Sequence, residues 1–299
     1  MDYIKINEKT YGYAVNFKDN DVLRNSYNNL TRKTYGFDFE QWYQNGYWKD
    51  KYIPYALIDG NTIISNVSVS IMDFFLMGEK KRFIQIGTVM TDKEYRNQGL
   101  SRYLMEKVLE EWKDRCDLIY LFANNSVLDF YPKFGFSSVP EYQYSKEIFA
   151  RSLASDIIKL DMSNKKDRNF LFDTINGSLK FAQLAIHDNA SLIMFYCTSL
   201  MKENVYYIKH LDAIIIAEFK DDILFLNDIY CKWNVSLDNI IEAIANKETK
   251  KIVLGFTPKN TSSFDNNLLQ EEDTTLFVMK DKLKIFNNIK IMFPVLSHA

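Results

Sequence analysis

The stretch MTDKEYRNQGLSRYLMEKVLEEWK, residues 90–113, decides the fold of this chain. An apolar segment, FIQIGTV, precedes it at residues 83–89, and a second, LIYLFA, follows at residues 118–123. Both are short and rich in branched and aromatic side chains, which is typical of buried strands. A strand, a turn, a helix and a second strand within about 40 residues form a crossover unit of the kind that builds parallel sheets.

Residues 100–112 predict an amphipathic helix. Leu100, Leu104, Val108 and Trp112 recur every four residues, which places them on one face of a helix. Charged residues fill the opposite face. The helix therefore packs its apolar stripe on the sheet, and the turn before it lies at the end of the first strand.

That turn, RNQGLS at residues 96–101, has the features of a phosphate-binding site. The first N–H groups of a helix lack partners within the helix, and the helix dipole adds partial positive charge, so a phosphate there satisfies both. Gly99 lets the backbone approach a phosphate and adopt unusual φ angles. Arg96 and Arg102 add positive charge. The same residues also fit an ordinary helix start with two solvated arginines, so the motif needs a second signal.

The second signal is NNSVLDFYPKFGF, residues 124–136, which follows the second strand. Together the two motifs resemble the GNAT superfamily of acyl-CoA-dependent N-acyltransferases. That family has an (R/Q)-x-x-G-x-(G/A) pyrophosphate loop and, about 30 residues later, an asparagine at a strand end, a tyrosine in a short helix and a Gly-Phe pair. Here the tyrosine is Tyr131 and the pair is Gly135-Phe136. Ser101 and Pro132 depart mildly from the family pattern.

The resemblance implies an α/β (α+β) fold in which a mixed, mostly antiparallel sheet is flanked by helices. At 299 residues the chain is long enough for two domains. We expect a GNAT domain over residues 1–150 and a second, smaller GNAT-like α/β domain over residues 151–299, because the strand–turn–helix–strand order recurs at residues 223–256. The turn of that repeat, CKWNVS at residues 231–236, has no glycine. A second CoA site is therefore not expected.

In the rest of the chain, the pattern of apolar and polar residues and the residues typical of turns predict further elements. Residues 3–6 predict a first strand, and Asp59-Gly60-Asn61 predicts a hairpin turn. A further hairpin is expected at residues 73–81. Residues 155–202 look mostly helical, and the polar segment 260–273 is expected to be a mobile loop.

The resemblance also implies a cofactor and a set of site residues. The cofactor is acetyl-CoA, with acetyl as the default acyl group. The expected cofactor-binding residues come from the loop, from two neighbouring strand ends and from one tyrosine: Thr88, Val89, Met90, Arg96, Asn97, Gln98, Gly99, Leu100, Ser101, Arg102, Asn124 and Tyr131. Tyr131 lies where the family places a general acid, since a phenol can protonate a departing thiolate. The alternative is that its ring only packs on the cofactor. No general base is assigned, because Glu40, Asp73 and a water chain are equal candidates.

Two further patterns have two interpretations each. Residues 37–55 are dense in aromatic rings, which either line an acceptor pocket, as the first helices of the family do, or pack in the core. Asn66, Ser68 and Ser70 alternate with apolar residues on a predicted strand. This polar face either lines the substrate cleft or faces water.

Composition limits the partners and the location. Lys plus Arg total 37 and Asp plus Glu total 39, a net charge of −2, which argues against nucleic acid as the main partner. The sequence has neither an apolar run long enough to span a bilayer nor a signal peptide at its start, so no membrane partner and a cytoplasmic location are expected. The three cysteines and three histidines show no metal-ligand spacing, so no metal is expected.

The expected function is that of an N-acetyltransferase, which transfers an acetyl group from acetyl-CoA to a primary amine of a small molecule or peptide by direct attack. The alternative is a non-catalytic acyl-CoA-binding sensor or scaffold, which the missing base leaves open. The sequence leaves the acceptor undefined, because acceptor sites differ widely on one fold. It also leaves a homodimer open.

Overall fold

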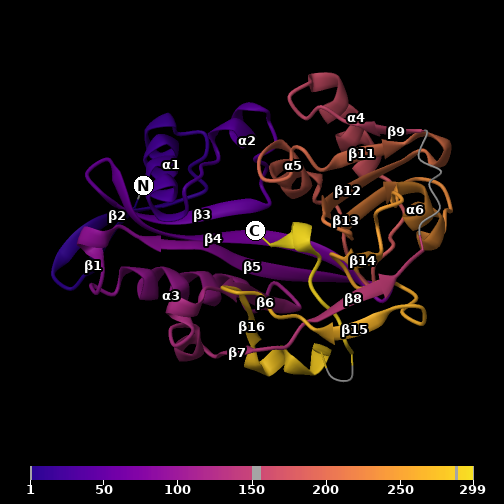
Figure 1. The fold of residues 1–299 in the computed structure, drawn as a ribbon. Coiled ribbons are helices and arrows are strands. Elements are labelled where there is room, and N and C mark those ends of the chain that lie inside the picture. Colours follow the sequence, from indigo (N-terminus) through magenta and orange to yellow (C-terminus); the bar gives the residue numbers. More distant parts are fainter. Residues whose placement is uncertain (1, 150–155, 287–288, 299) are drawn as a thin grey trace.

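Two sheets with helices packed on their faces build the molecule (Figure 1). The computed structural model describes residues 2–149, 156–286 and 289–298. The strands of the first sheet are, in chain order, β1 (Asp2–Ile6), β2 (Lys9–Val15), β3 (Tyr52–Asp59), β4 (Thr62–Leu76), β5 (Glu79–Thr91), β6 (Leu118–Ala123), β7 (Phe136–Ser138), β10 (Leu184–Ile186) and β16 (Thr275–Met279).

Within the described residues this sheet follows the order β1-β2-β3-β4-β5-β6-β16-β7, with β10 paired to the far end of β4. Its neighbouring strands are antiparallel except for β5 and β6, which run parallel. The crossover between β5 and β6 is the helix α3 (Leu100–Trp112). The predicted mixed, mostly antiparallel sheet flanked by helices is confirmed.

The second sheet has the order β15-β8-β14-β13-β12-β11-β9. Its strands are β8 (Tyr142–Glu147), β9 (Ile157–Lys159), β11 (Val205–Ile208), β12 (Ala213–Lys220), β13 (Ile223–Cys231), β14 (Lys251–Leu254) and β15 (Asp265–Leu268). The helices of this half are α4 (Lys165–Ile175), α5 (Ala190–Thr198) and α6 (Leu237–Ile244). Strands β13 and β14 are parallel and joined through α6, which repeats the arrangement of β5, α3 and β6.

The two halves of the sequence exchange strands. β8, from the first half, lies in the second sheet between β15 and β14. β16, from the second half, lies in the first sheet between β6 and β7 and pairs antiparallel with both. The division into domains at residue 150 stays a prediction, since residues 150–155 are outside the described part, but the sheets do not follow it.

Residues with positive φ form the turns of the first three hairpins. Asn7 and Glu8 both have positive φ, so the chain turns after β1 and returns as β2, where the sequence predicted a single strand. The predicted turn at Gly60 joins β3 to β4. Met77 and Gly78, again with positive φ, join β4 to β5 in one long hairpin.

Two predictions for the second half are wrong in part. The segment 155–202, expected to be mostly helical, contains β9 and β10 besides α4 and α5. The segment 260–273, expected to be a mobile loop, contains β15, which pairs with β8. All three strands are only three or four residues long and find their partners far away in the sequence, so a local pattern does not reveal them.

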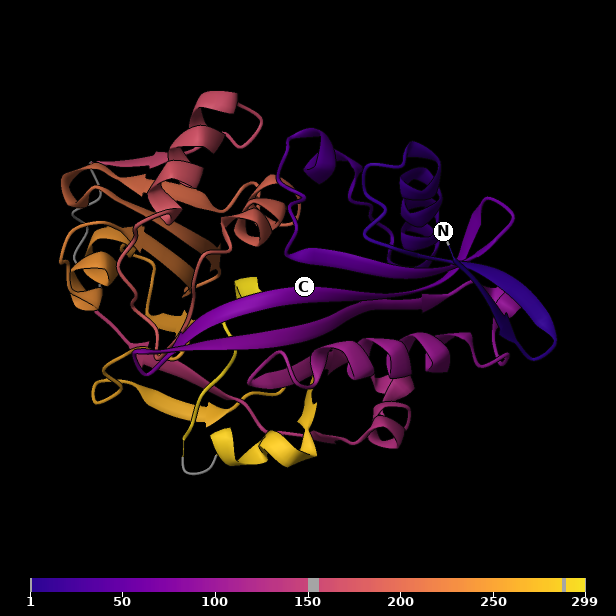
Figure 2. The ribbon, with the colours of Figure 1, turned by 180° about the vertical axis from the view of Figure 1, so that it is seen from behind.

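Most aromatic residues between positions 37 and 55 are buried in the core, and the others, Phe37, Tyr43 and Tyr47, are partly buried and pack against it, which supports the second of their two interpretations. The helices α1 (Asp21–Tyr35) and α2 (Glu40–Gln44) lie on the face of the first sheet opposite to α3 (Figures 1 and 2). Phe39 and Trp42 are buried and pack on Phe195 of α5, at ring-centroid distances of 5.3 and 5.7 Å. The Trp42 indole N–H donates to the carbonyl of Ser191, 2.8 Å away.

Phe277 tests how much the inserted strand β16 stabilises the protein. Its side chain is buried in the cluster that joins α3 to the sheet. Phe277→Ala should lower the free energy of unfolding by about 3–5 kcal/mol, because it leaves a cavity there. Urea unfolding measures the change. Phe149→Ala is the matched control, since Phe149 is 98% exposed. Equal effects of the two substitutions would show that β16 does not stabilise the core.

Glu141 makes stability depend on pH. Its side chain is buried between β7 and β8 and accepts a hydrogen bond from the backbone N–H of Phe293, 2.7 Å away. Burial raises the pKa of this carboxyl to about 8. The unfolded chain therefore loses this proton at lower pH than the folded chain. Stability is full below the unfolded pKa and falls as the pH rises from about 4.5 towards 8.

Glu141→Gln should remove that dependence, because the amide keeps an acceptor oxygen and does not ionise. The free energy of unfolding of the wild type should fall by about 2–4 kcal/mol more than that of the variant between pH 5 and pH 8. Urea titrations at the two pH values measure this. Parallel pH profiles for the two proteins would contradict the assignment.

Candidate functional site

A pocket of about 680 Å³ opens where β5 and β6 separate. The parallel pairing of these strands ends at Ile86 and Leu121. Eleven of the twelve residues predicted for the site line this pocket: Thr88, Val89, Met90, Arg96, Asn97, Gly99, Leu100, Ser101, Arg102, Asn124 and Tyr131. The fold brings them together from two strand ends, one helix start and one short 3-10 helix. Their roles in binding stay predictions.

Gln98 is the predicted residue that does not line the pocket. Its backbone carbonyl accepts a hydrogen bond from Asn7 Nδ2 at 2.8 Å, and its Oε1 accepts one from the Tyr11 hydroxyl at 3.2 Å. Gln98 therefore ties the loop to the β1–β2 hairpin. The sequence motif gave no sign of this role, because the hairpin is about 90 residues away along the chain.

The loop enters α3 through a glycine in the left-handed region. Gly99 precedes the first residue of the helix and has φ = 80°. A Cβ added there would meet only Asn7 Nδ2, at 3.9 Å, so the surrounding protein leaves space on this side. The backbone angle is what favours glycine here, and the open space leaves the N–H groups of the helix start accessible to a ligand.

Hydroxyl groups fasten the helix start to the end of β5. Ser101 Oγ lies 2.6 Å from Thr91 Oγ1, which lies 2.8 Å from Ser65 Oγ. Arg96 Nε donates to the carbonyl of Thr91 at 3.3 Å. Ser101, the departure from the family pattern, thus uses its hydroxyl to hold the loop. Arg96 and Arg102 are exposed and place positive charge at the rim of the pocket.

A β-bulge shapes the strand that forms the pocket wall. On β4 and β5, Asn66 pairs with Met90 while Ser68 pairs with Gly87, so β5 carries one extra residue over this span. Thr88 lies in the bulge with φ = 48°. Such a bulge bends its strand and turns backbone groups away from the ladder, here at the place where β5 leaves β6.

A buried hydrogen-bond network holds this bulge in place. Asn66 Nδ2 donates to the Thr88 carbonyl at 2.9 Å, and Thr88 Oγ1 lies 2.6 Å from the Tyr52 hydroxyl. The Tyr52 hydroxyl lies 2.5 Å from that of Tyr27, which lies 3.3 Å from Ser68 Oγ. Neither interpretation of the polar face of β4 holds here, because Asn66 and Ser68 are fully buried and bond inside the protein.

Tyr131 lines the pocket as a neutral phenol. It begins a 3-10 helix (Tyr131–Phe134), is 6% exposed, and packs on Phe130 and on Phe277 of β16. Burial raises the pKa of Tyr131 to about 12, so the hydroxyl keeps its proton at neutral pH. This geometry fits both interpretations, a proton donor and a ring that packs on the cofactor.

The carboxylates considered as bases lie elsewhere. Glu40 accepts hydrogen bonds from Arg24 and Asn28 beneath α1, and Asp73 forms ion pairs with Lys51 and Arg82 at the far end of β4. Neither lines the pocket. Within the described residues its lining contains no carboxylate and no imidazole.

Three contacts made by residues that line the pocket could not be predicted from the sequence. The Tyr35 hydroxyl of α1 donates to the carbonyl of Val89 at 2.9 Å. Asn124 Nδ2 donates to Asp273 at 3.0 Å, so the second half holds this predicted residue. His298 stacks on Phe122 at 3.8 Å between ring centroids, and burial lowers the pKa of its imidazole to about 4. Each contact joins segments that only tertiary structure brings together.

In residues 2–149, 156–286 and 289–298, no group of three or more His, Cys, Asp or Glu side chains is placed to hold a metal ion. None of the helices in this part of the chain is both long and apolar enough to cross a bilayer.

Comparison with known proteins gives a family model and several similar structures. Residues 17–139 match the model described as an acetyltransferase (GNAT) domain. A GCN5-related N-acetyltransferase from Kribbella flavida is 12% identical with a TM-score of 0.55, over 90% of this chain and 71% of that one. A conserved protein of unknown function from Enterococcus faecalis V583, described as a probable N-acyltransferase, is 14% identical with a TM-score of 0.57, over 93% and 74%.

A third structure, a GCN5-related N-acetyltransferase from Anabaena variabilis ATCC 29413, is 13% identical with a TM-score of 0.53, over 89% of this chain and 72% of that one. At this level of identity the three structures establish a shared fold alone. Because each covers about nine tenths of the chain, the shared fold extends over both sheets.

Gly99 tests whether the loop binds a pyrophosphate. Asn and Asp both tolerate left-handed φ better than other side chains, so Gly99→Asn and Gly99→Asp differ chiefly in charge. Gly99→Asp should abolish acetyl-CoA binding, and Gly99→Asn should weaken it by about tenfold or less. Calorimetric titration measures both affinities. Equal affinities for the two variants would rule out a phosphate beside residue 99.

Proposed function

Because the N-terminal half of this chain is a GNAT acetyltransferase domain, we propose that the protein is an N-acetyltransferase that moves an acetyl group from acetyl-CoA to a primary amine of a small molecule or peptide. The observation that carries the proposal is the pocket between β5 and β6, where the glycine loop, the bulge and Tyr131 meet. A cytoplasmic location and a homodimer stay predictions from the sequence.

The chemistry of the lining residues fits acetyl-CoA. The open N–H groups at the start of α3, with Arg96 and Arg102 beside them, suit a pyrophosphate. Beyond Ile86, the edge of β5 that faces β6 is released from the ladder, and its backbone groups suit the amides of a pantetheine arm, in the manner of an added strand. When bound, acetyl-CoA supplies an acetyl group activated as a thioester.

In the proposed transfer the amine nitrogen bonds to the acyl carbon while the carbon–sulfur bond breaks. The leaving sulfur needs a proton, and Tyr131 holds one at neutral pH in the wall of the pocket. The amine must lose a proton. Since the described lining contains no carboxylate and no imidazole, we assign this step to water. The network around Thr88 keeps the bulge rigid, which fixes the backbone against which the acyl group is oriented.

The alternative is a protein that binds acyl-CoA without using it, as a sensor or scaffold. The pocket alone would serve either function. The position of a protonated phenol in its wall favours the enzyme, because binding needs no proton donor there. Release of free thiol in the presence of a panel of amines distinguishes the two, and binding without any release would favour the sensor.

Tyr131→Phe tests the proton donor. The ring stays while the hydroxyl is lost, so acetyl-CoA affinity should change little and turnover should fall by about 10²-fold. Thiol release with saturating acetyl-CoA and an accepted amine measures turnover. Tyr95→Phe is the matched control, since Tyr95 lines the same pocket but donates its hydroxyl proton to Asp59 at 2.9 Å. Unchanged turnover in Tyr131→Phe would assign that ring to packing.

A further inference from the structure

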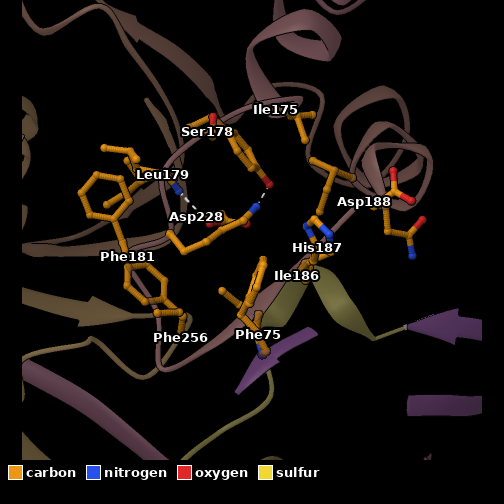
Figure 3. A pocket seen from close by; sticks show the side chains of 18 of the residues that line it. Phe75, Ile175, Ser178, Leu179, Phe181, Ile186, His187, Asp188, Asp228 and Phe256 are labelled. Atoms are coloured by element: carbon orange, nitrogen blue, oxygen red, sulfur yellow. Dashed lines mark hydrogen bonds between the residues drawn. The ribbon is translucent and has the colours of Figure 1, made fainter. Parts of the chain in front are cut away.

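A second cavity lies between the two sheets, at the far end of the β4–β5 hairpin (Figure 3). Its volume is about 540 Å³, within the range of ligand sites in proteins. Phe75 of β4 and Ile186 of β10 contribute one side of the cavity. Both of these strands belong to the first sheet. The other side comes from β13 of the second sheet and from the connection that follows α4.

Most of the wall is apolar. Figure 3 shows Phe75, Phe181 and Phe256 arranged around the cavity, with Ile175 and Ile186 farther along its wall. Such a wall favours an apolar body over a sugar or a nucleotide. Four charged residues also line the cavity: Lys180, Asp188, Asp228 and Lys259. Asp188 and Lys259 are exposed, whereas Lys180 and Asp228 are partly buried, so these two determine which ligands the apolar part can hold.

Asp228 places a carboxylate in this wall. It follows a bulge of β13, where Ile216 pairs with Asp228 and Ala217 pairs with Leu226. The carboxylate accepts hydrogen bonds from the Tyr230 hydroxyl at 2.7 Å and from the Ile229 N–H at 2.8 Å. These donors fix its orientation. Burial raises its pKa, so a cation beside it would be favourable.

Lys180 lines the same cavity and carries a positive charge. Backbone hydrogen bonds clamp the chain on both sides of it: the Leu179 N–H donates to Cys231 at 2.8 Å, and the Phe181 carbonyl accepts from Lys259 at 2.9 Å. Burial lowers the pKa of Lys180, and Asp228 opposes that shift. In the described part of the chain, no carboxylate lies within 4.0 Å of this ammonium.

We propose that this cavity binds a small zwitterion with an apolar body, of which an apolar α-amino acid is the representative. Lys180 takes the carboxylate, Asp228 takes the ammonium, and the aromatic wall takes the side chain. Two partly buried charged groups of opposite sign that do not touch each other gain most from a ligand that pairs with both. The clamped backbone and the fixed carboxylate make the site ready before the ligand arrives.

The site is separate from the pocket at the start of α3. Phe75 pairs with Lys80, and Thr88 lies eight positions after Lys80 along β5. At the rise of a strand this is about 25 Å. The amino-acid site therefore does not depend on the proposed acetyl transfer.

Calorimetric titration of the full-length protein with L-phenylalanine and L-leucine tests the proposal. Saturable binding of at least one of them is expected. L-Phenylalaninamide lacks the carboxylate and 3-phenylpropionate lacks the ammonium, so each should bind about tenfold or more weakly than L-phenylalanine. No saturable binding of either amino acid up to about 10 mM, or equal affinity for L-phenylalanine and both analogues, would overturn the proposal.

Substitutions of Lys180 and Asp228 test which group of the ligand each residue binds. Lys180→Met should weaken L-phenylalanine binding by about tenfold and abolish the preference over the amide, because no partner for the carboxylate is left. Asp228→Asn should likewise abolish the preference over 3-phenylpropionate. Lys220→Met, which changes an exposed lysine of the same sheet, should change nothing. Retained preferences in both cavity variants would overturn the assignment. Gly99→Asp should bind L-phenylalanine as the wild type does, even if it loses acetyl-CoA.

Discussion

Strand β16 pairs with β6 on one side and with β7 on the other, and much of the molecule depends on this pairing. Without β16, the edge of β6 in the first sheet would be open, and β7 would have no partner in it. Conversely, β8 comes from the first half of the chain but lies in the second sheet, between β14 and β15. Each sheet is therefore completed by the other half of the chain. One buried apolar cluster also spans both halves, from Tyr27 of α1 to Ile216 of β12.

The same pairing reaches the candidate site. Phe277 of β16 packs on Tyr131, and Asp273, just before β16, holds Asn124 at the end of β6. The opposite wall is held by the network from Tyr27 through Tyr52 to the bulge at Thr88. Buried networks of this kind are rigid when their members are paired. The pocket is thus held from both sides by groups that do not themselves line it. A backbone fixed in this way can orient a reacting group.

The long β4–β5 hairpin connects two regions of different chemistry. Its end at the start of α3 offers backbone N–H groups and arginines to an anion. Its other end, at the turn with Gly78, meets the second half and encloses an apolar cavity with Lys180 and Asp228. The second half therefore does more than cover the first sheet. It supplies the charged groups of a separate cavity while its own β13–α6–β14 unit, which has no glycine loop, keeps the topology of the first.

The sequence by itself determined the crossover unit and the helix start at Gly99, because these features depend on local periodicity and on a backbone angle that few residues adopt. The eleven predicted residues that line one pocket were implied by the resemblance of two motifs to the GNAT superfamily. Only the tertiary structure decided that Gln98 faces the first hairpin, that Asn66 and Ser68 are buried, and that β8 and β16 exchange sheets. Strand partners and buried hydrogen bonds are chosen among segments far apart in the chain, and a short strand carries the same local pattern whichever sheet it joins.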